Sequence, residues 1–274
     1  CDFPPGGCAV SWTLLRGTLH QRRASIFWFC IGLVLYSWLM TWFYPKIGGG
    51  RYAEMIQSLP PEVLVIFGGT EVPFASLGGY FQTEYLGLMW MIIVAAAVVL
   101  FAGRAFSGEV GAGTMELLLA QPISRLQLAL TRVAAFVGYT VVLSAASFVP
   151  IQAFGPAYGI ELGAKTFWTL FAFGTLFMLA VGGLAMLLSA VFRDSGRPSG
   201  IAAGLLVVFW IADLVSSVSK AARFFDPINL VSYWQPGKII NGESISPRAW
   251  WIYGLVGALS LAAAVVLFRR RDVA

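Results

Sequence analysis

Residues able to do acid–base, nucleophilic or metal chemistry are few in this sequence, and they do not gather in a recognisable pattern. The single histidine, His20, lies in a basic stretch, where we expect an interfacial residue rather than a base or a ligand. The cysteines are Cys1, Cys8 and Cys30, an odd number without a pair at metal-site spacing, which disfavours a disulfide framework and a zinc site. No Ser-His-Asp set or carboxylate pair stands out on a shared face. The sequence therefore predicts neither catalytic residues nor a metal site.

One acidic residue, Asp213, lies toward the outer end of a long apolar run. An acidic side chain inside a membrane is costly and often functional. Ser216 and Ser217 follow it, so one interpretation is an intramembrane polar site that contacts substrate or carries a proton. The other interpretation, which we favour, is a hydrogen-bonded structural acid or an acid at the membrane surface.

The segment between the second and third apolar runs has the most distinctive local pattern. Thr114 is suited to cap a short helix, and Glu116 lies in the first turn of that helix, where a negative charge is favourable. The leucines 117–119 form an apolar block, Pro122 ends the helix, and Ser124 is suited to cap the next one. A short, partly apolar helix exposed beside a membrane needs a partner to cover it.

The composition indicates that these residues are held by membrane-spanning elements. Hydrophobic residues make up 58% of the 274 residues, charged residues only 11%, and the mean hydropathy is +0.79. Soluble domains carry about 25% charged residues, and disordered chains are still more polar, so both classes are excluded. The net charge of +5 does not indicate a nucleic-acid partner, because the basic residues lie at the ends of apolar runs.

The apolar runs predict an all-α membrane protein with one transmembrane domain over residues 1–274. A span needs about 20 apolar residues. Six runs are long enough, and we place them at 26–44, 85–103, 128–150, 166–191, 200–219 and 249–268.

Two further regions are predicted to lie beside the membrane. Residues 10–23 combine apolar and arginine positions at helical spacing, which indicates an amphipathic interfacial helix; a plain basic flank is the alternative. We expect short helices at 51–82, in the first extracellular loop, where a compact loop packed on the spans is the alternative. In the fourth run, Gly174, Gly182 and Gly183 are expected to permit a tilt or kink.

The distribution of positive charge predicts the orientation. With six spans, both termini lie on one side, and that side holds most of the 18 Lys and Arg residues. Because cytoplasmic loops are enriched in Lys and Arg, we expect both termini in the cytoplasm and the protein in the cell (plasma or inner) membrane.

The string from Glu109 to Arg125 resembles the cytoplasmic-loop motif of ABC-2-type transporter permeases. The stretch 59–68 also resembles members of this family, as do the six runs and the arginine-rich end after the last of them. The resemblance implies that the loop 104–125 docks into a groove on a cytosolic ATPase and transmits closure of the nucleotide sandwich; a simple interfacial connector is the alternative. The implied ATPase-coupling residues are Glu109, Gly113, Thr114, Glu116, Leu117, Leu118, Pro122 and Arg125.

The resemblance also implies the partners. Two six-span permeases, identical or homologous, pair in the membrane lipid with two cytosolic ABC ATPase subunits, which bind ATP and Mg²⁺. A P-loop needs Gly-x-x-x-x-Gly-Lys-Ser/Thr, and none of the four lysines of this chain lies in such a motif, so no cofactor is expected on this chain. Gly200 and Gly204 form a Gly-x-x-x-Gly pattern, which suits either a dimer face or ordinary helix packing.

The expected function is therefore that of the permease subunit of an ATP-driven exporter for a hydrophobic, amphipathic or lipid-linked substrate. The direction of transport comes from the resemblance alone. The main alternative is a permease-like accessory or scaffold subunit of another membrane complex that does not transport. A membrane-embedded enzyme is disfavoured, because no catalytic constellation is present.

Overall fold

The structure is a computed structural model that describes residues 10–47, 76–108, 124–192, 194, 196–218 and 220–270. Every regular element within these ranges is a helix. The elements are α1 (Trp12–Gln21), α2 (Arg23–Ile47), α5 (Leu77–Phe81), η1 (Gln82–Leu86), α6 (Leu88–Gly103), α9 (Arg125–Phe154), η2 (Gly155–Tyr158), α10 (Ala164–Val191), α11 (Gly196–Val218), η3 (Lys220–Phe225), α12 (Pro236–Ile240) and α13 (Pro247–Arg270).

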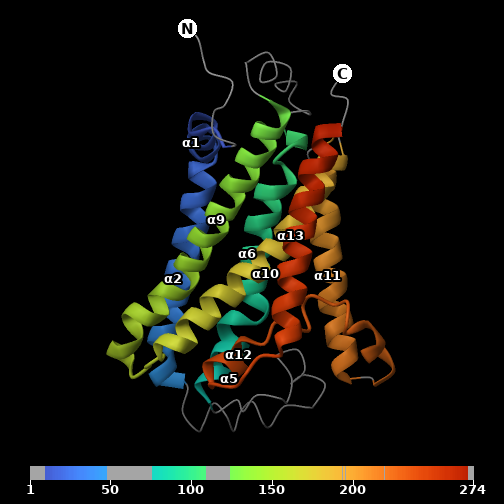
Figure 1. The fold of residues 1–274 in the computed structure, drawn as a ribbon. Helices are drawn as coiled ribbons and strands as arrows, with labels where there is room; N and C mark the ends of the chain where they lie inside the picture. Colours follow the sequence, from blue (N-terminus) through green and yellow to red (C-terminus); the bar gives the residue numbers. More distant parts are fainter. Residues whose placement is uncertain are drawn as a thin grey trace.

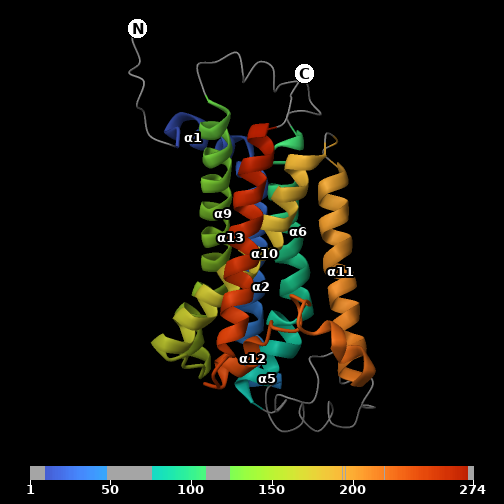
Figure 2. The same cartoon turned by 45° about the vertical axis from the view of Figure 1, so that its right-hand side comes forward.

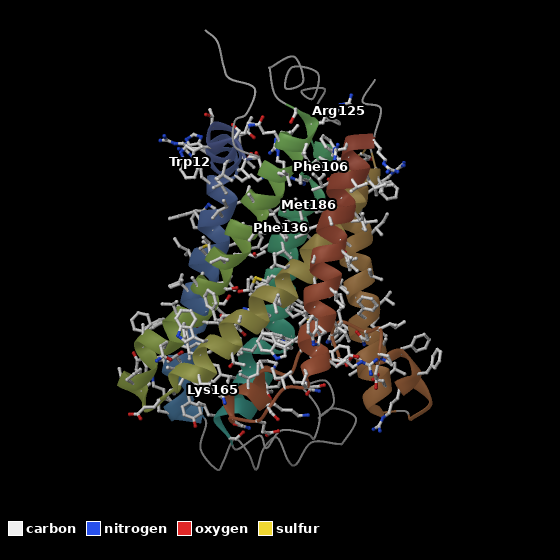
Figure 3. All side chains as sticks on the ribbon, in the orientation of Figure 1. Trp12, Phe106, Arg125, Phe136, Lys165 and Met186 are labelled. Carbon is white, nitrogen blue, oxygen red and sulfur yellow. The ribbon has the colours of Figure 1, made fainter. Side chains whose placement is uncertain are left out.

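The long helices form one bundle that runs between two ends (Figure 1). Among the described residues, five helices are long and apolar enough to cross a membrane. A sixth span is added if the bent pair of helical segments Leu77–Leu86 and Leu88–Gly103 is counted as one. Trp12 and Arg125 lie at one end of the bundle and Lys165 at the other (Figure 3). We call these the Arg125 end and the Lys165 end. Helix α13 finishes at the Arg125 end, where α1 also lies, as an even number of crossings requires.

Helix α10 is the centre of the bundle and packs against α6, α9, α11 and α13. It crosses its neighbours obliquely in Figure 1 but is continuous from Ala164 to Val191. The three glycines expected to permit a tilt or kink are buried packing positions. A Cβ at Gly182 would collide with the ring of Phe136, and a Cβ at Gly183 would lie 3.3 Å from the carbonyl oxygen of Gly257 on α13. The absence of side chains at these positions therefore allows close helix packing.

The second predicted run does not form one straight helix. The helical segment Leu77–Leu86 ends in a π-helical turn, η1, and meets α6 at a bend of 44°. Gly87 lies at the bend, where any Cβ would collide with the carbonyl oxygen of Gln82. The altered turn exposes carbonyl groups, and side chains from other helices satisfy them: the Tyr36 hydroxyl donates to the Glu84 carbonyl at 2.6 Å, and Trp234 Nε1 donates to the Leu86 carbonyl at 2.7 Å.

Two short helices meet at the Lys165 end. Helix α5 lies at the end of the region predicted to contain short helices, while residues 51–75 of that region are outside the described part of the chain. A Cβ at Gly78 would collide with the carbonyl oxygen of Gly237, at the start of α12. Asn241 Oδ1 accepts from the Gly78 amide at 2.9 Å, and Gln82 Oε1 accepts from the Gly237 amide at 2.9 Å. These contacts join the bent span to the loop before α13.

Helix α1 lies across the Arg125 end of the bundle and turns sharply into α2 (Figure 2). The break falls at Arg22, whose backbone leaves the helical region. The amide of Ser11 donates to Thr131 Oγ1 at 3.1 Å, which attaches the start of α1 to α9. A helix, α1, thus forms within residues 10–23, separate from the first span, and its amphipathic, interfacial character stays a prediction.

Candidate functional site

The structure describes only the two ends of the predicted coupling segment, up to Gly108 and from Ser124 onward. All of the predicted coupling residues except Arg125 lie outside the described residues. Arg125 is half-buried and is the first residue of α9. The geometry that bears on coupling is therefore how the spans hold these two ends.

The first end is held by α10 through one serine. Ser189 Oγ accepts hydrogen bonds from the backbone amides of Phe106 and Ser107, both at 3.0 Å, and donates to Ser107 Oγ at 3.2 Å. Ser107 Oγ in turn donates to the Gly103 carbonyl at 2.9 Å. Ser189 and Ser107 are fully buried. Because buried amides need partners, Ser189 fixes the backbone at the point where α6 leads into the coupling segment.

Two more helices, α11 and α13, pack against the end of α6 that leads into this segment. The ring of Phe106 stacks on Phe268 of α13, with centroids 4.4 Å apart, and both rings are fully buried. Gly103 lets α6 pack closely against α11, because any Cβ at this position would collide with Ser199 Oγ. The end of α6 thus contacts α10, α11 and α13 within a few residues.

Arg22, at the break between α1 and α2, binds the carbonyl end of α6. Its Nη1 donates to the Phe101 carbonyl at 2.8 Å and to the Leu100 carbonyl at 3.3 Å, and its Nη2 donates to the Arg104 carbonyl at 3.2 Å. The guanidinium also lies 4.7 Å from the centre of the Phe101 ring. The last carbonyls of a helix lack partners within it and carry partial negative charge, so a cation stabilises them. Burial, and next the charge of Arg104, lower the pKa of Arg22 from its ordinary value.

The second end of the coupling segment begins α9. Ser124 Oγ accepts from the Gln127 amide at 3.1 Å, which confirms the predicted cap. One turn further on, Thr131 Oγ1 donates to the Gln127 carbonyl at 2.7 Å while it accepts from Ser11. This end is therefore tied to α1, as the first end is through Arg22. A displacement of the segment would reach α6, α9, α10 and α13 through these fixed contacts.

Of the predicted intramembrane polar site, the described residues show one contact, between Asp213 and Ser216. Asp213 is half-buried, and Ser216, which is buried, donates to the backbone carbonyl of Asp213 at 3.0 Å within the same helix. The side chain of Ser217 lies outside the described residues. Grooves at α1 and at the end of α13 are not lined by Asp213. Within the described part of the chain, no three His, Cys, Asp or Glu side chains form a group that could hold a metal ion.

A known protein family matches almost the whole chain. The family described as ABC-2 family transporter protein matches residues 22–273. The chain belongs to the ABC-2 transporter family. The match includes every candidate span and both described ends of the coupling segment. No protein with a curated description matches the chain.

This ABC-2 permease is thus a multi-pass membrane protein of a transporter, and its anchoring residues are ones that sequence reasoning missed. Arg22 looked like one of several flanking positive charges, and only its position at the break between two helices directs it to α6. Ser189 lies in an apolar run, near the end of the predicted span at 166–191. Nothing in its local sequence indicates the distant backbone amides that it binds.

Proposed function

We propose that this ABC-2 permease is the membrane subunit of an ATP-driven exporter and that the segment 104–125 couples it to a separate cytosolic ABC ATPase. The observation that carries the proposal is the anchoring of both described ends of this segment to the spans. Ser189 and Arg22 fix one end through backbone groups, and Ser124 with Thr131 fixes the other. A segment that transmits movement to the spans requires attachment of this kind.

The charge distribution supports a cytoplasmic Arg125 end, with both chain termini on that side of the cell membrane. Among the described residues, the arginines at this end far outnumber its acids, as the positive-inside rule expects of a cytoplasmic face. They are Arg16, Arg22, Arg23, Arg104, Arg125, Arg132, Arg197, Arg269 and Arg270. In this orientation α1 lies in the inner membrane interface, where the 74% exposed Trp12 is favourable.

The proposed mechanism is mechanical. ATP and Mg²⁺ bind to the partner ATPases, because this sequence has no P-loop. When the ATPases close, the docked segment moves, and its two anchored ends transmit the movement to α6 and α9. The contacts of Ser189 and Phe106 carry it on to α10 and α13.

A second permease, identical or homologous, completes the path. Helix α11 supports this part of the proposal, because it packs on α6 and α10 and leaves an apolar side exposed, including Val207, Val208 and Ile211. A Cβ added at Gly200 or Gly204 would meet no atom within 4 Å, so their side of the helix is open to a close neighbour. A path between such apolar helices suits a hydrophobic, amphipathic or lipid-linked substrate.

The test is purification of the tagged permease from its own cells in mild detergent. We expect an ABC ATPase to co-purify and to hydrolyse ATP. Glu116→Lys reverses the charge in the first turn of the predicted docking helix, so it should lower recovery of the ATPase about tenfold or uncouple hydrolysis from transport. Glu243→Lys, an equal charge change at the Lys165 end, is the matched control and should have no effect.

Two results would overturn the proposal. One is a permease that recovers no ATPase. The other is a Glu116→Lys complex that assembles and transports as the unmodified complex does. Recovery of an intact complex in which the permease moves no substrate would instead support an accessory subunit.

A further inference from the structure

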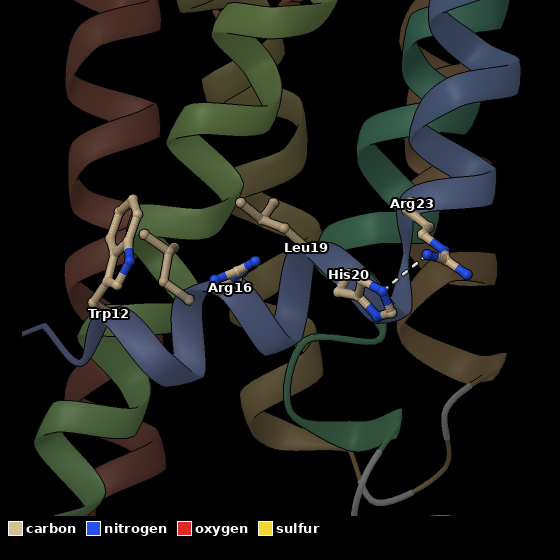
Figure 4. Close-up of a pocket in the computed structure, with 6 residues that line it drawn as sticks. Trp12, Arg16, Leu19, His20 and Arg23 are labelled. Carbon is tan, nitrogen blue, oxygen red and sulfur yellow. Dashed lines mark hydrogen bonds between the residues drawn. The ribbon is translucent and has the colours of Figure 1, made fainter.

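Helix α1 and the first residue of α2 form an open groove with a volume of about 410 Å³ (Figure 4). It is lined by Trp12, Leu15, Arg16, Leu19, His20 and Arg23. These positions recur every three or four residues, so they lie along one side of α1 and continue to the first turn of α2. Arg22 is not among the residues that line the groove, and its guanidinium donates to carbonyls of α6.

The groove carries positive charge that no acidic residue near it in the sequence balances. No Asp or Glu occurs from residue 10 to residue 53. Arg16 is exposed, and within the described part of the chain it makes no hydrogen bond or ion pair. Arg23 donates from Nη1 to His20 Nε2 at 2.9 Å, because an arginine has only donors (Figure 4). Arg16 therefore remains available for an anion, and Arg23 has further N–H groups to donate.

The other groove residues, Trp12, Leu15 and Leu19, are apolar and follow α1 toward the start of α2. Trp12 is 74% exposed, and in Figure 4 its ring and the side chain of Leu19 extend from α1 in the direction in which α2 runs. The next turn of α2 exposes Phe27 and Trp28, at 56% and 68%. A ligand that fits this arrangement has an anionic group at the level of α1 and a long apolar part that follows α2.

We infer that this groove binds an acidic phospholipid of the inner leaflet. The phosphate lies between the guanidinium groups of Arg16 and Arg23, and the acyl chains pack on Trp12 and along the exposed side of α2. A guanidinium binds phosphate strongly, through charge-assisted hydrogen bonds. The inference rests on the proposed placement of α1 in the inner interface. A small soluble anion would satisfy the arginines but would leave the apolar half of the groove uncovered.

The site has a consequence for coupling, because Arg23 is adjacent to Arg22. A lipid held by Arg16 and Arg23 would fix the break between α1 and α2, from which Arg22 reaches the end of α6. The anchoring of the coupling segment would then depend on the acidic lipid content of the membrane.

The experiment is a titration of the purified full-length permease with phosphatidylglycerol, followed by native mass spectrometry, with phosphatidylcholine titrated in parallel. Each arginine that contacts the headgroup contributes roughly fivefold to the binding of an acidic lipid, so the double variant R16Q/R23Q should bind phosphatidylglycerol about 30-fold more weakly. The control R269Q/R270Q removes the same charge at the same end of the bundle, from exposed positions of α13. It should bind within about threefold of the unmodified protein.

Three results would overturn the inference: equal losses in the two double variants, equal binding of phosphatidylcholine, or equally tight binding of the deacylated headgroup glycerophosphoglycerol or of inorganic phosphate. Trp12→Ala provides a second readout, because it should weaken phosphatidylglycerol and leave the binding of inorganic phosphate unchanged. No ATPase is present in this assay, so its outcome is separate from that of the co-purification test.

Discussion

Replacing Ser189 by alanine tests how the coupling segment is rooted in the bundle. The substitution removes one hydroxyl, to which the buried amides of Phe106 and Ser107 donate at 3.0 Å. Because Phe106 and Ser107 are buried, water cannot replace the missing hydroxyl, and both amides would be left without an acceptor. An unsatisfied buried donor costs about 1–3 kcal/mol, so the free energy of unfolding should fall by about 2–4 kcal/mol after partial relaxation.

Ser147→Ala is the matched control. Ser147 is equally buried, but its hydroxyl donates to the Leu143 carbonyl of its own helix, at 2.8 Å, and the neighbouring Tyr85 hydroxyl keeps the Ser147 backbone carbonyl as its acceptor in the variant. Its removal leaves no donor without a partner, so the loss should stay below about 1 kcal/mol.

The assay is thermal unfolding of the detergent-purified permease, followed by ATP hydrolysis with its partner ATPase. A loss of about 2–4 kcal/mol corresponds to a Tm roughly 4–16 °C lower. Transport per ATP hydrolysed should also fall in Ser189→Ala, because the end of the segment is no longer fixed to α10. If Ser189→Ala and Ser147→Ala unfold at the same temperature and couple equally well, the rooting of the segment through Ser189 is refuted.

Two more predictions concern packing and orientation. Gly78→Ala places a Cβ against the Gly237 carbonyl and should destabilise the protein by about 1–3 kcal/mol. In the control Gly254→Ala the Cβ meets no atom within 4 Å, so this variant should be neutral or stabilising. Thermal unfolding of both variants contradicts the argument if Gly254→Ala has the lower Tm. In a cysteine-free background, Glu161→Cys at the Lys165 end should react with an impermeant maleimide in intact cells and Ser124→Cys only after permeabilisation, and the opposite pattern would invert the proposed topology.

The local predictions that succeeded depend on short-range chemistry. The predicted cap at Ser124 is confirmed, because a serine before an amphipathic run satisfies the free amides whatever the rest of the fold does. Arg22 and Ser189 could not be found in this way. The role of each is set by a backbone group far away in the chain, and no local pattern encodes that partner.

The bend before α6 shows the same limit within one span. The apolar run from residue 85 predicts a span, and the structure adds that η1 and Gly87 precede its straight part, α6. A π-helical turn is stable here because Tyr36 and Trp234, from distant parts of the chain, bind the carbonyls it exposes. Hydropathy measures only whether a segment prefers lipid to water, so it contains no information about these partners.

By itself the sequence determined that the chain is a membrane protein and which of its segments are apolar enough to cross the bilayer. It also determined which family its loop motif resembles. These properties follow from composition and length, because a bilayer selects segments by their apolar length alone. Only the tertiary structure decided how α1 is placed across the bundle, where α6 begins, and which residues hold the coupling segment. Those features arise from hydrogen bonds and close contacts between helices far apart in the chain, and such contacts exist only once the bundle has assembled.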